Sequence, residues 1–197
     1  MLTLLVLISG GGSNLRALLE AASDDAYPAR VIAVGSDTEA EGLAHAELFE
    51  VPTFTVLASS FENRAAWGAE LLAQIEHWSP DLVVCAGFMR ILPPAVVTAL
   101  APRIINTHPA LLPAFPGAHA VRDALAAGVE TTGVTVHVID EGVDTGPVIV
   151  QREVAVLPGD TEHALHERIK VVERELLVQA VRDIADGVVD LKETAAR

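Results

Sequence analysis

The sequence contains little cysteine, few aromatic residues and few cations. A single cysteine, Cys85, stands among 197 residues, so no disulfide can form within the chain and no cysteine cluster can hold a metal. Aromatic residues make up 4% of the chain, and 13 Lys and Arg face 27 Asp and Glu, for a net charge of −14. Because nucleic-acid binding requires cations that neutralise phosphates, this balance argues against a nucleic-acid partner.

The chain also lacks a long apolar run. The apolar stretch Leu2–Ile8 is far too short to span a bilayer, and no cationic segment precedes it, as a signal peptide would require. We therefore expect a soluble cytoplasmic protein that does not associate with membranes. Its partners should be small molecules, and it should act as a monomer or a homodimer.

Hydrophobic residues, mainly Val, Leu, Ala and Ile, make up 51% of the sequence, which suits a buried parallel sheet. Patterning predicts strands at residues 2–8, 30–34, 53–56, 81–86, 104–107, 132–138 and 148–156, with a last strand at 188–191. It predicts helices at residues 15–22, 42–49, 63–78, 94–100, 118–127 and 161–186. The alternation predicts one α/β domain, residues 1–197, with a Rossmann-like, mostly parallel sheet and helices on both faces. Two successive strands in the second half depart from simple doubly wound order.

A glycine-rich segment, Ser9-Gly-Gly-Gly-Ser-Asn14, separates the first strand from the first helix. Glycines let the backbone approach a ligand, and a helix N-terminus offers free N–H groups, so we expect a phosphate here. Ser13 and Asn14 are the expected helix caps. The segment completes neither the Walker pattern nor G-x-G-x-x-G, because Leu15 stands at the third glycine position. Asp37 could imitate the ribose-binding acid of a dinucleotide fold, and a tight turn without a ligand is the alternative.

Asn106 and His108 stand at the end of a predicted buried strand, followed by a loop with three prolines. The two-residue period of a strand points both side chains to one face. An imidazole can move protons, and an amide can donate to a developing oxyanion. Asp144, in the Gly-bracketed acidic loop after residues 133–138, could pair with an imidazolium or hold a water, although a solvated surface hairpin gives the same pattern.

The apolar segment Gly87–Pro93, with one arginine, could line a pocket for a flat aromatic ligand, or it could pack its own hydrophobic side chains. His119 and His137, considered singly, are packing or hydrogen-bonding residues. Together with His108 and Asp144 they are ligand types that suit zinc, but no closely spaced pair joins them. We therefore expect no metal.

Four segments together resemble the folate-dependent phosphoribosylglycinamide formyltransferases. They are Ile8–Leu15, Gly87–Leu92, Asn106–Pro113 with Pro116-Gly117, and the Gly133…His137…Asp144-x-Gly146 series. No single segment is decisive, but the four occur in the family's order and the resemblance covers nearly the whole chain. Ala110 and Val121 depart from it, since relatives often have Ser and His there.

The resemblance implies transfer of a formyl group from 10-formyltetrahydrofolate to the amine of phosphoribosylglycinamide, without a metal. It implies a catalytic set of Asn106, His108 and Asp144. The implied ribonucleotide-binding residues are Gly12, Ser13, Asn14, Lys170 and Glu173. The implied folate-binding residues are Arg64, Met89, Arg90, Ile91, Leu92, Asn106, Asp140, Glu141, Val143 and Asp144. The phosphate-binding half is then about residues 1–100, and the folate and catalytic half about 101–197.

Three other functions fit parts of this sequence. Methionyl-tRNA formyltransferases share the Asn-x-His and Leu-Leu-Pro elements but carry a further C-terminal domain and bind a polyanion. Formyltetrahydrofolate hydrolases carry an N-terminal regulatory domain, whereas the first strand here begins at Leu2. A non-catalytic nucleotide-binding module would explain the glycine segment, but it would leave Asn106, His108 and Asp144 without a role.

Overall fold

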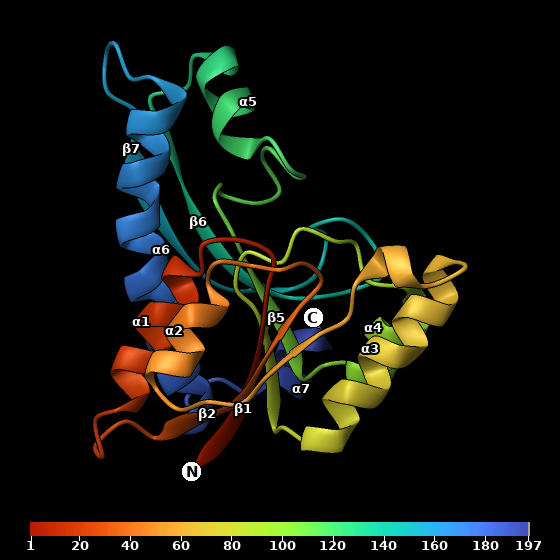
Figure 1. Cartoon of the computed structure of the whole chain (residues 1–197). Coiled ribbons are helices and arrows are strands. Elements are labelled where there is room, and N and C mark those ends of the chain that lie inside the picture. The colour runs from red at the N-terminus through yellow and green to blue at the C-terminus, as the bar shows by residue number, and fades with distance from the viewer. Residues whose placement is uncertain (197) are drawn as a thin grey trace.

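Seven strands form one sheet in the order β3-β2-β1-β4-β5-β6-β7 in the computed structural model, which describes residues 1–196 (Figure 1). The strands are β1 (Leu2–Ile8), β2 (Ala29–Ser36), β3 (Thr53–Thr55), β4 (Leu82–Cys85), β5 (Ile104–His108), β6 (Thr131–Val138) and β7 (Val148–Ala155). The first five are parallel, and β6 and β7 join antiparallel. This confirms the predicted mostly parallel sheet and its departure from doubly wound order.

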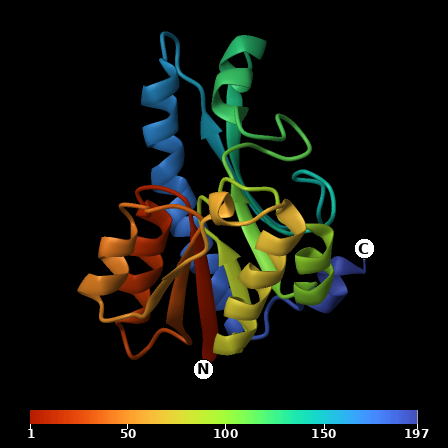
Figure 2. The same ribbon diagram turned by 45° about the vertical axis from the view of Figure 1, so that its right-hand side comes forward.

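Helices cover both faces of the sheet (Figure 2). They are α1 (Ser13–Ala22), α2 (Leu43–Leu48), α3 (Arg64–Trp78), α4 (Pro94–Leu100), α5 (Ala120–Ala127), α6 (Glu162–Ala185) and α7 (Leu191–Ala195). Helices α1, α2 and α6 pack on one face, and α3 and α4 on the other, as Figure 1 shows. The second strand, the helix positions and the long α6 match the sequence predictions within a few residues.

The apolar run of β1 follows from its burial on both faces. Leu4 and Val6 join the core beneath α1 and α6, whereas Leu5 and Leu7 join the core beneath α3 and α4. Because successive side chains of a strand point to opposite faces, a stretch of strand that is covered on both sides is apolar at nearly every position. This explains why β1 reads as continuous rather than alternating hydrophobicity.

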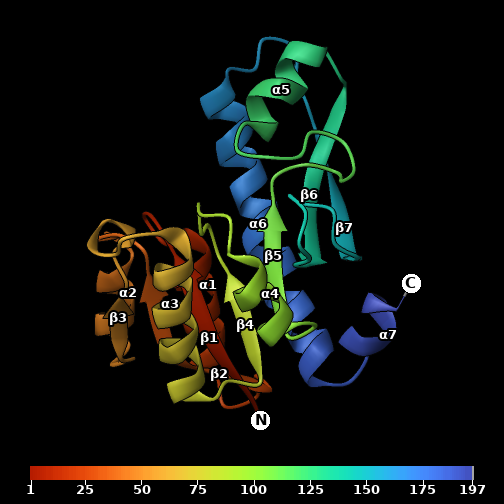
Figure 3. The same ribbon diagram turned by 90° about the vertical axis from the view of Figure 1, so that its right-hand side faces the viewer.

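Strands β6 and β7 and helix α5 extend beyond the carboxyl ends of the parallel strands, as the side view shows (Figure 3). The register places Asn106 opposite His137 and His108 opposite Thr135. The end of β5 therefore lies against the middle of β6. Two segments separated by some thirty positions in the sequence thus place polar side chains together.

The predicted last strand at residues 188–191 is wrong. Val188 is largely exposed, and the amides of Val188 and Val189 bond back to the Asp183 carbonyl in a turn that closes α6. Asp190 then accepts hydrogen bonds from the Lys192 and Glu193 amides and caps α7. The Asp190 cap therefore determined that this segment begins a helix, whereas the two adjacent valines were too short a run to form a strand.

The predicted capping of the first helix by Ser13 and Asn14 is also wrong. The helix begins at Ser13, its cap position is Gly12 with φ +70°, and no side chain caps it. A Cβ at Gly12 would lie 2.9 Å from the Gly42 Cα, so this position requires glycine in both conformation and space. The N-terminus of α1 is therefore left without a side-chain cap.

Candidate active site

Strand β5 presents three polar side chains at its carboxyl end. His108 and Thr107 are buried, and Asn106 is half-buried. The Thr107 hydroxyl donates to Glu173 Oε1 of α6 at 3.1 Å, on the opposite face from Asn106 and His108. The position outside the carboxyl end of a parallel strand is where open α/β sheets bind ligands.

The proline loop after β5 is held to the two antiparallel strands. The Thr135 hydroxyl donates to the Ala110 carbonyl at 2.6 Å and accepts from the Leu112 amide at 3.0 Å. The Gln151 amide donates to the Leu112 carbonyl at 2.8 Å, and the Leu112–Pro113 bond is cis. The loop with three prolines is therefore also fixed by hydrogen bonds to β6 and β7.

Asp144 lies at the centre of a compact polar cluster, with its backbone at φ +55°. One oxygen accepts from the Gly117 amide at 2.7 Å and lies 3.4 Å from His108 Nδ1. The other lies 3.6 Å from His137 Nε2. The His137 ring is the largest influence that lowers the pKa of Asp144; burial opposes it, and the Gly117 amide and a charged His108 add to it.

Both nitrogens of His108 face hydrogen-bond acceptors. Nε2 lies 2.8 Å from the Phe115 carbonyl and Nδ1 faces the Asp144 carboxylate. A carbonyl only accepts, so Nε2 carries a proton, and a protonated ring can donate to both partners at once. This arrangement can hold an imidazolium against Asp144.

His137 belongs to the cluster, whereas the residue considered singly was predicted to have only a packing or hydrogen-bonding role. Its Nδ1 lies 3.0 Å from the Val138 carbonyl and therefore carries a proton. In the neutral ring Nε2 can accept from the Asn106 amide, 3.3 Å away, whereas a protonated ring would donate to Asp144 instead. Only the β5–β6 register could have identified this pairing.

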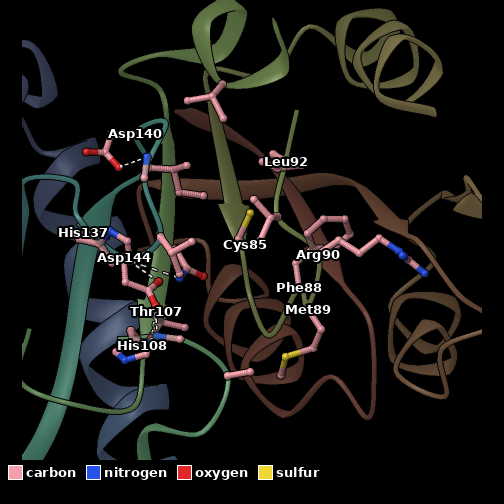
Figure 4. Close-up of a pocket in the computed structure, with 18 of the residues that line it drawn as sticks. Cys85, Phe88, Met89, Arg90, Leu92, Thr107, His108, His137, Asp140 and Asp144 are labelled. Carbon is pink, nitrogen blue, oxygen red and sulfur yellow. Dashed lines mark hydrogen bonds and ion pairs between the residues drawn. The ribbon is translucent and has the colours of Figure 1, made fainter. Parts of the chain in front are cut away.

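A cavity of about 400 Å³ separates this cluster from the segment Gly87–Leu92 (Figure 4). Cys85 and Ile139 contribute to its mostly apolar lining. Nine of the ten implied folate-side residues line it: Met89, Arg90, Ile91, Leu92, Asn106, Asp140, Glu141, Val143 and Asp144. Arg64 does not, because its guanidinium donates to the carbonyls of Ile91 and Leu92 at 2.7 and 2.9 Å.

The implied ribonucleotide residues are less closely grouped. Of these five residues Ser13 alone lines a second cavity, of about 580 Å³ between α1 and α6, where Gly11 and Arg174 also contribute to the lining. Lys170 is outside that lining and forms an ion pair with Glu167 at 2.7 Å. The buried Asn14 Oδ1 has no hydrogen-bond partner within residues 1–196.

Asp37 does not occupy a ribose-binding position. It is buried and accepts hydrogen bonds from Ser9 and Arg90, so its oxygens are already used within the protein.

In the described part of the chain, no group of three or more His, Cys, Asp or Glu side chains is arranged to hold a metal ion, and His119 is exposed. None of the helices within residues 1–196 has the length and apolar character needed to cross a membrane.

Comparison with known proteins gives consistent results. A family model described as formyl transferase matches residues 2–181. The phosphoribosylglycinamide formyltransferase of Mycobacterium tuberculosis is 56% identical over 182 residues, 92% of this chain and 84% of that protein. Its namesake from Escherichia coli is 41% identical over 196 residues, 99% of this chain and 92% of that protein. The solved structure of glycinamide ribonucleotide transformylase 1 from Symbiobacterium toebii matches with a TM-score of 0.92 and 41% identity, covering 95% of this chain and 89% of that one.

Proposed function

Since the chain belongs to the formyl transferase family, we propose that it transfers the formyl group of 10-formyltetrahydrofolate to the amine of phosphoribosylglycinamide. The products would be the formylglycinamide ribonucleotide and tetrahydrofolate, a step of purine biosynthesis. The enzyme would meet these small molecules in the cytoplasm, as a monomer or a homodimer. Relatives named for this activity, which align over nearly the whole chain, support this assignment.

One observation carries the proposal: an apolar cavity lies between the segment Met89–Leu92 and the cluster of His108 and Asp144. A cavity with an apolar wall suits a flat aromatic ring, and a few convergent polar groups can orient its reactive substituent. The formyl group of a folate bound there would lie beside Asn106 and His108.

The chemistry follows from these side chains. Attack of the amine forms a C–N bond to the formyl carbon and converts its oxygen to an oxyanion. The Asn106 amide can donate to that oxyanion, and a protonated His108, whose two N–H groups face Phe115 and Asp144, can stabilise it through its positive charge. Collapse of the intermediate breaks the bond to the folate nitrogen, which takes up a proton as the attacking amine loses one.

Asp144 supports this reaction through its carboxylate. Its carboxylate faces His108 Nδ1 at 3.4 Å and can stabilise the imidazolium. Its lowered pKa keeps it ionised across the range in which an amine acceptor is nucleophilic. A water held by the carboxylate could carry protons between the amine and the leaving nitrogen.

In this proposal, the glycine segment and α6 bind the ribonucleotide. The open N-terminus of α1 at Gly12–Asn14 would receive the phosphate, because its free N–H groups and dipole favour anions. Glu173 would contact the ribose from the buried face of α6, and Lys170 would add positive charge after leaving Glu167.

A three-acceptor assay tests the assignment. The purified protein is incubated with 10-formyltetrahydrofolate and, separately, phosphoribosylglycinamide, water alone and methionyl-tRNA. We expect formyl transfer to the ribonucleotide amine only. Tetrahydrofolate release with water alone would indicate a hydrolase, formylation of the tRNA would indicate a tRNA formyltransferase, and ribonucleotide binding without turnover would indicate a binding module.

A further inference from the structure

A closed ring of hydrogen bonds joins the start of the glycine segment to the folate-side wall. The Met89 amide donates to the Ser9 hydroxyl at 2.8 Å, and that hydroxyl donates to one oxygen of Asp37. Arg90 Nε donates to the other oxygen of Asp37, and Arg90 follows Met89 in the chain. Every donor in the ring therefore has an acceptor.

Asp37 is the buried centre of this ring. Its side chain is 3% exposed, whereas that of Arg90 is 45% exposed. Burying a carboxylate is unfavourable unless it is paired and hydrogen-bonded, so the position of Arg90 is coupled to that of Asp37. The Arg90 guanidinium also lies 5.9 Å from the centre of the Trp67 ring, on which Phe88 stacks at 6.4 Å.

The segment that follows β4 has no regular structure of its own from Phe88 to Pro93. Met89 and Ile91 are exposed at the mouth of the cavity, so their own packing does not fix them. Arg64 holds the far end of the segment through the Ile91 and Leu92 carbonyls. The ring at Asp37 holds the near end.

We propose that Asp37 is a positioning residue that holds Met89 and Arg90 in place and thereby keeps the folate-side wall competent to bind. The proposal rests on the proposed function for the identity of the ligand. Asp37 acts through Ser9 and Arg90. Figure 4 shows the wall from Phe88 to Leu92 across the cavity from His108 and Asp144, so the ring supports binding rather than the reacting groups.

The glycine segment does not depend on Asp37 in the same way. The Ser9 amide donates to the Gly87 carbonyl at 3.1 Å, and its carbonyl accepts from the Thr38 hydroxyl at 2.9 Å. These bonds remain when the Asp37 carboxylate is lost. The two substrates should therefore respond differently to a change at this position.

Asp37→Asn tests the proposal. The variant amide can still accept from Ser9, but its NH₂ would face Arg90 Nε, donor against donor. If the wall is then in place about a tenth of the time, the KM for 10-formyltetrahydrofolate rises about tenfold. The KM for the ribonucleotide and kcat should stay within about threefold. Amide hydrogen exchange, read by mass spectrometry, should become faster in a peptide covering residues 88–92.

Asp81→Asn is the matched control. Asp81 also joins β1 to β4, accepting from the Thr3 amide and hydroxyl at 2.8 and 2.7 Å, but at the opposite end of the strands. It should lower thermal stability and leave both KM values and the exchange of residues 88–92 unchanged. Equal changes in Asp37→Asn and Asp81→Asn would overturn the proposal, as would a folded Asp37→Asn protein with a wild-type folate KM.

Ser9→Ala covers the case in which Asp37→Asn does not fold. It removes the hydroxyl that links Met89 to Asp37 and keeps the Arg90 pair. Its folate KM should rise by a smaller factor, again with the ribonucleotide KM unchanged, and no rise would refute the proposal. If the wild-type protein forms no formylated ribonucleotide, the proposed function fails. The exchange comparison then still decides whether the ring holds the segment.

Discussion

The side chains at the candidate centre are few, and each has a distinct partner. His108 has acceptors on both ring nitrogens, Asp144 has a backbone donor from Gly117, and Asn106 faces His137. Such fixed partners hold catalytic groups in position before substrate arrives, which lowers the reorganisation needed during reaction. The consequences can be tested one side chain at a time.

Loss of a single group at this centre should reduce turnover without unfolding the protein. We expect Asn106→Ala, His108→Ala and Asp144→Ala each to lower kcat by roughly 10²–10³, the usual effect of removing one oxyanion donor or its support. His119→Ala is the matched control, because His119 is exposed and outside the cluster. Steady-state rates and circular dichroism are measured together; near-normal kcat in all three variants would contradict the assignment.

Acid should reveal the pairing of Asp144. Its pKa is lowered in the folded protein, so its carboxylate adds stability above the unfolded value of about 4, and that contribution is lost as pH falls through the lower folded pKa. Asp144→Asn should be less stable than wild type by roughly 1 kcal/mol at pH 7. Urea unfolding at pH 7 and pH 3 should show this gap shrinking; a gap that widens toward pH 3 would exclude the stabilising role.

Cys85 should be chemically inert in the folded state. Burial raises the pKa of its thiol to about 12, and its side chain lines the cavity between the segment Gly87–Leu92 and His108. Because the thiolate is the reactive form, iodoacetamide at pH 8 should not label the native protein but should label it fully in urea. Rapid labelling of the native protein would show that the cavity opens to solvent at Cys85.

At the scale of elements, the glycine segment and α1 make a close contact with α2. Gly12→Ala adds a Cβ at φ +70° that meets the Gly42 Cα at 2.9 Å. Gly128→Ala is a matched control, since its φ is +66° and no atom lies near the added Cβ. The left-handed conformation alone should cost about 1–2 kcal/mol, so Gly12→Ala should lose more stability than Gly128→Ala. The KM of the Gly12→Ala variant for the ribonucleotide should also rise.

Chemical denaturation of both glycine variants, followed by KM measurements with each substrate, checks this expectation. The control variant should keep both KM values. Equal losses of stability would mean that α2 moves aside freely, and an unchanged ribonucleotide KM in Gly12→Ala would argue against phosphate binding at this segment.

The sequence predicted the elements whose signals are local. The apolar run Leu2–Ile8 and the helical pattern of residues 161–186 can each be recognised within one stretch of sequence, and both elements are confirmed. The 188–191 segment was predicted wrongly because two adjacent valines outweighed the Asp190 cap.

The sequence pattern could not predict contacts between distant segments. His137 lies opposite Asn106 only because β6 pairs with β5 in one particular register, which no local signal specifies. Asp37 meets Arg90 across 53 positions of sequence, and the pattern suggested a ribose-binding acid instead. The Asn106–His108 pair was predictable because strand periodicity alone places both side chains on one face.

At the scale of the whole molecule, the candidate centre forms where the strands of the sheet change from parallel to antiparallel. β5 is the last parallel strand, and the antiparallel β6 brings His137 and the Asp140–Asp144 loop across its carboxyl end. A purely parallel sheet would leave that end open to a following helix. The change of direction therefore supplies the second wall of the cavity.

The net charge of −14 should make the stability of the molecule depend on salt. Repulsion among surface carboxylates opposes the compact state, and the screening length falls from about 30 Å at 0.01 M salt to about 8 Å at 0.15 M. We expect NaCl between these concentrations to raise Tm at pH 8 by about 2–4 °C, equivalent to about 1 kcal/mol for a chain of this size. KCl should act equally, and the effect should vanish near pH 4.7, the isoelectric point. A fall in Tm with salt would instead mean that ion pairs such as Arg168–Asp160 outweigh the repulsion.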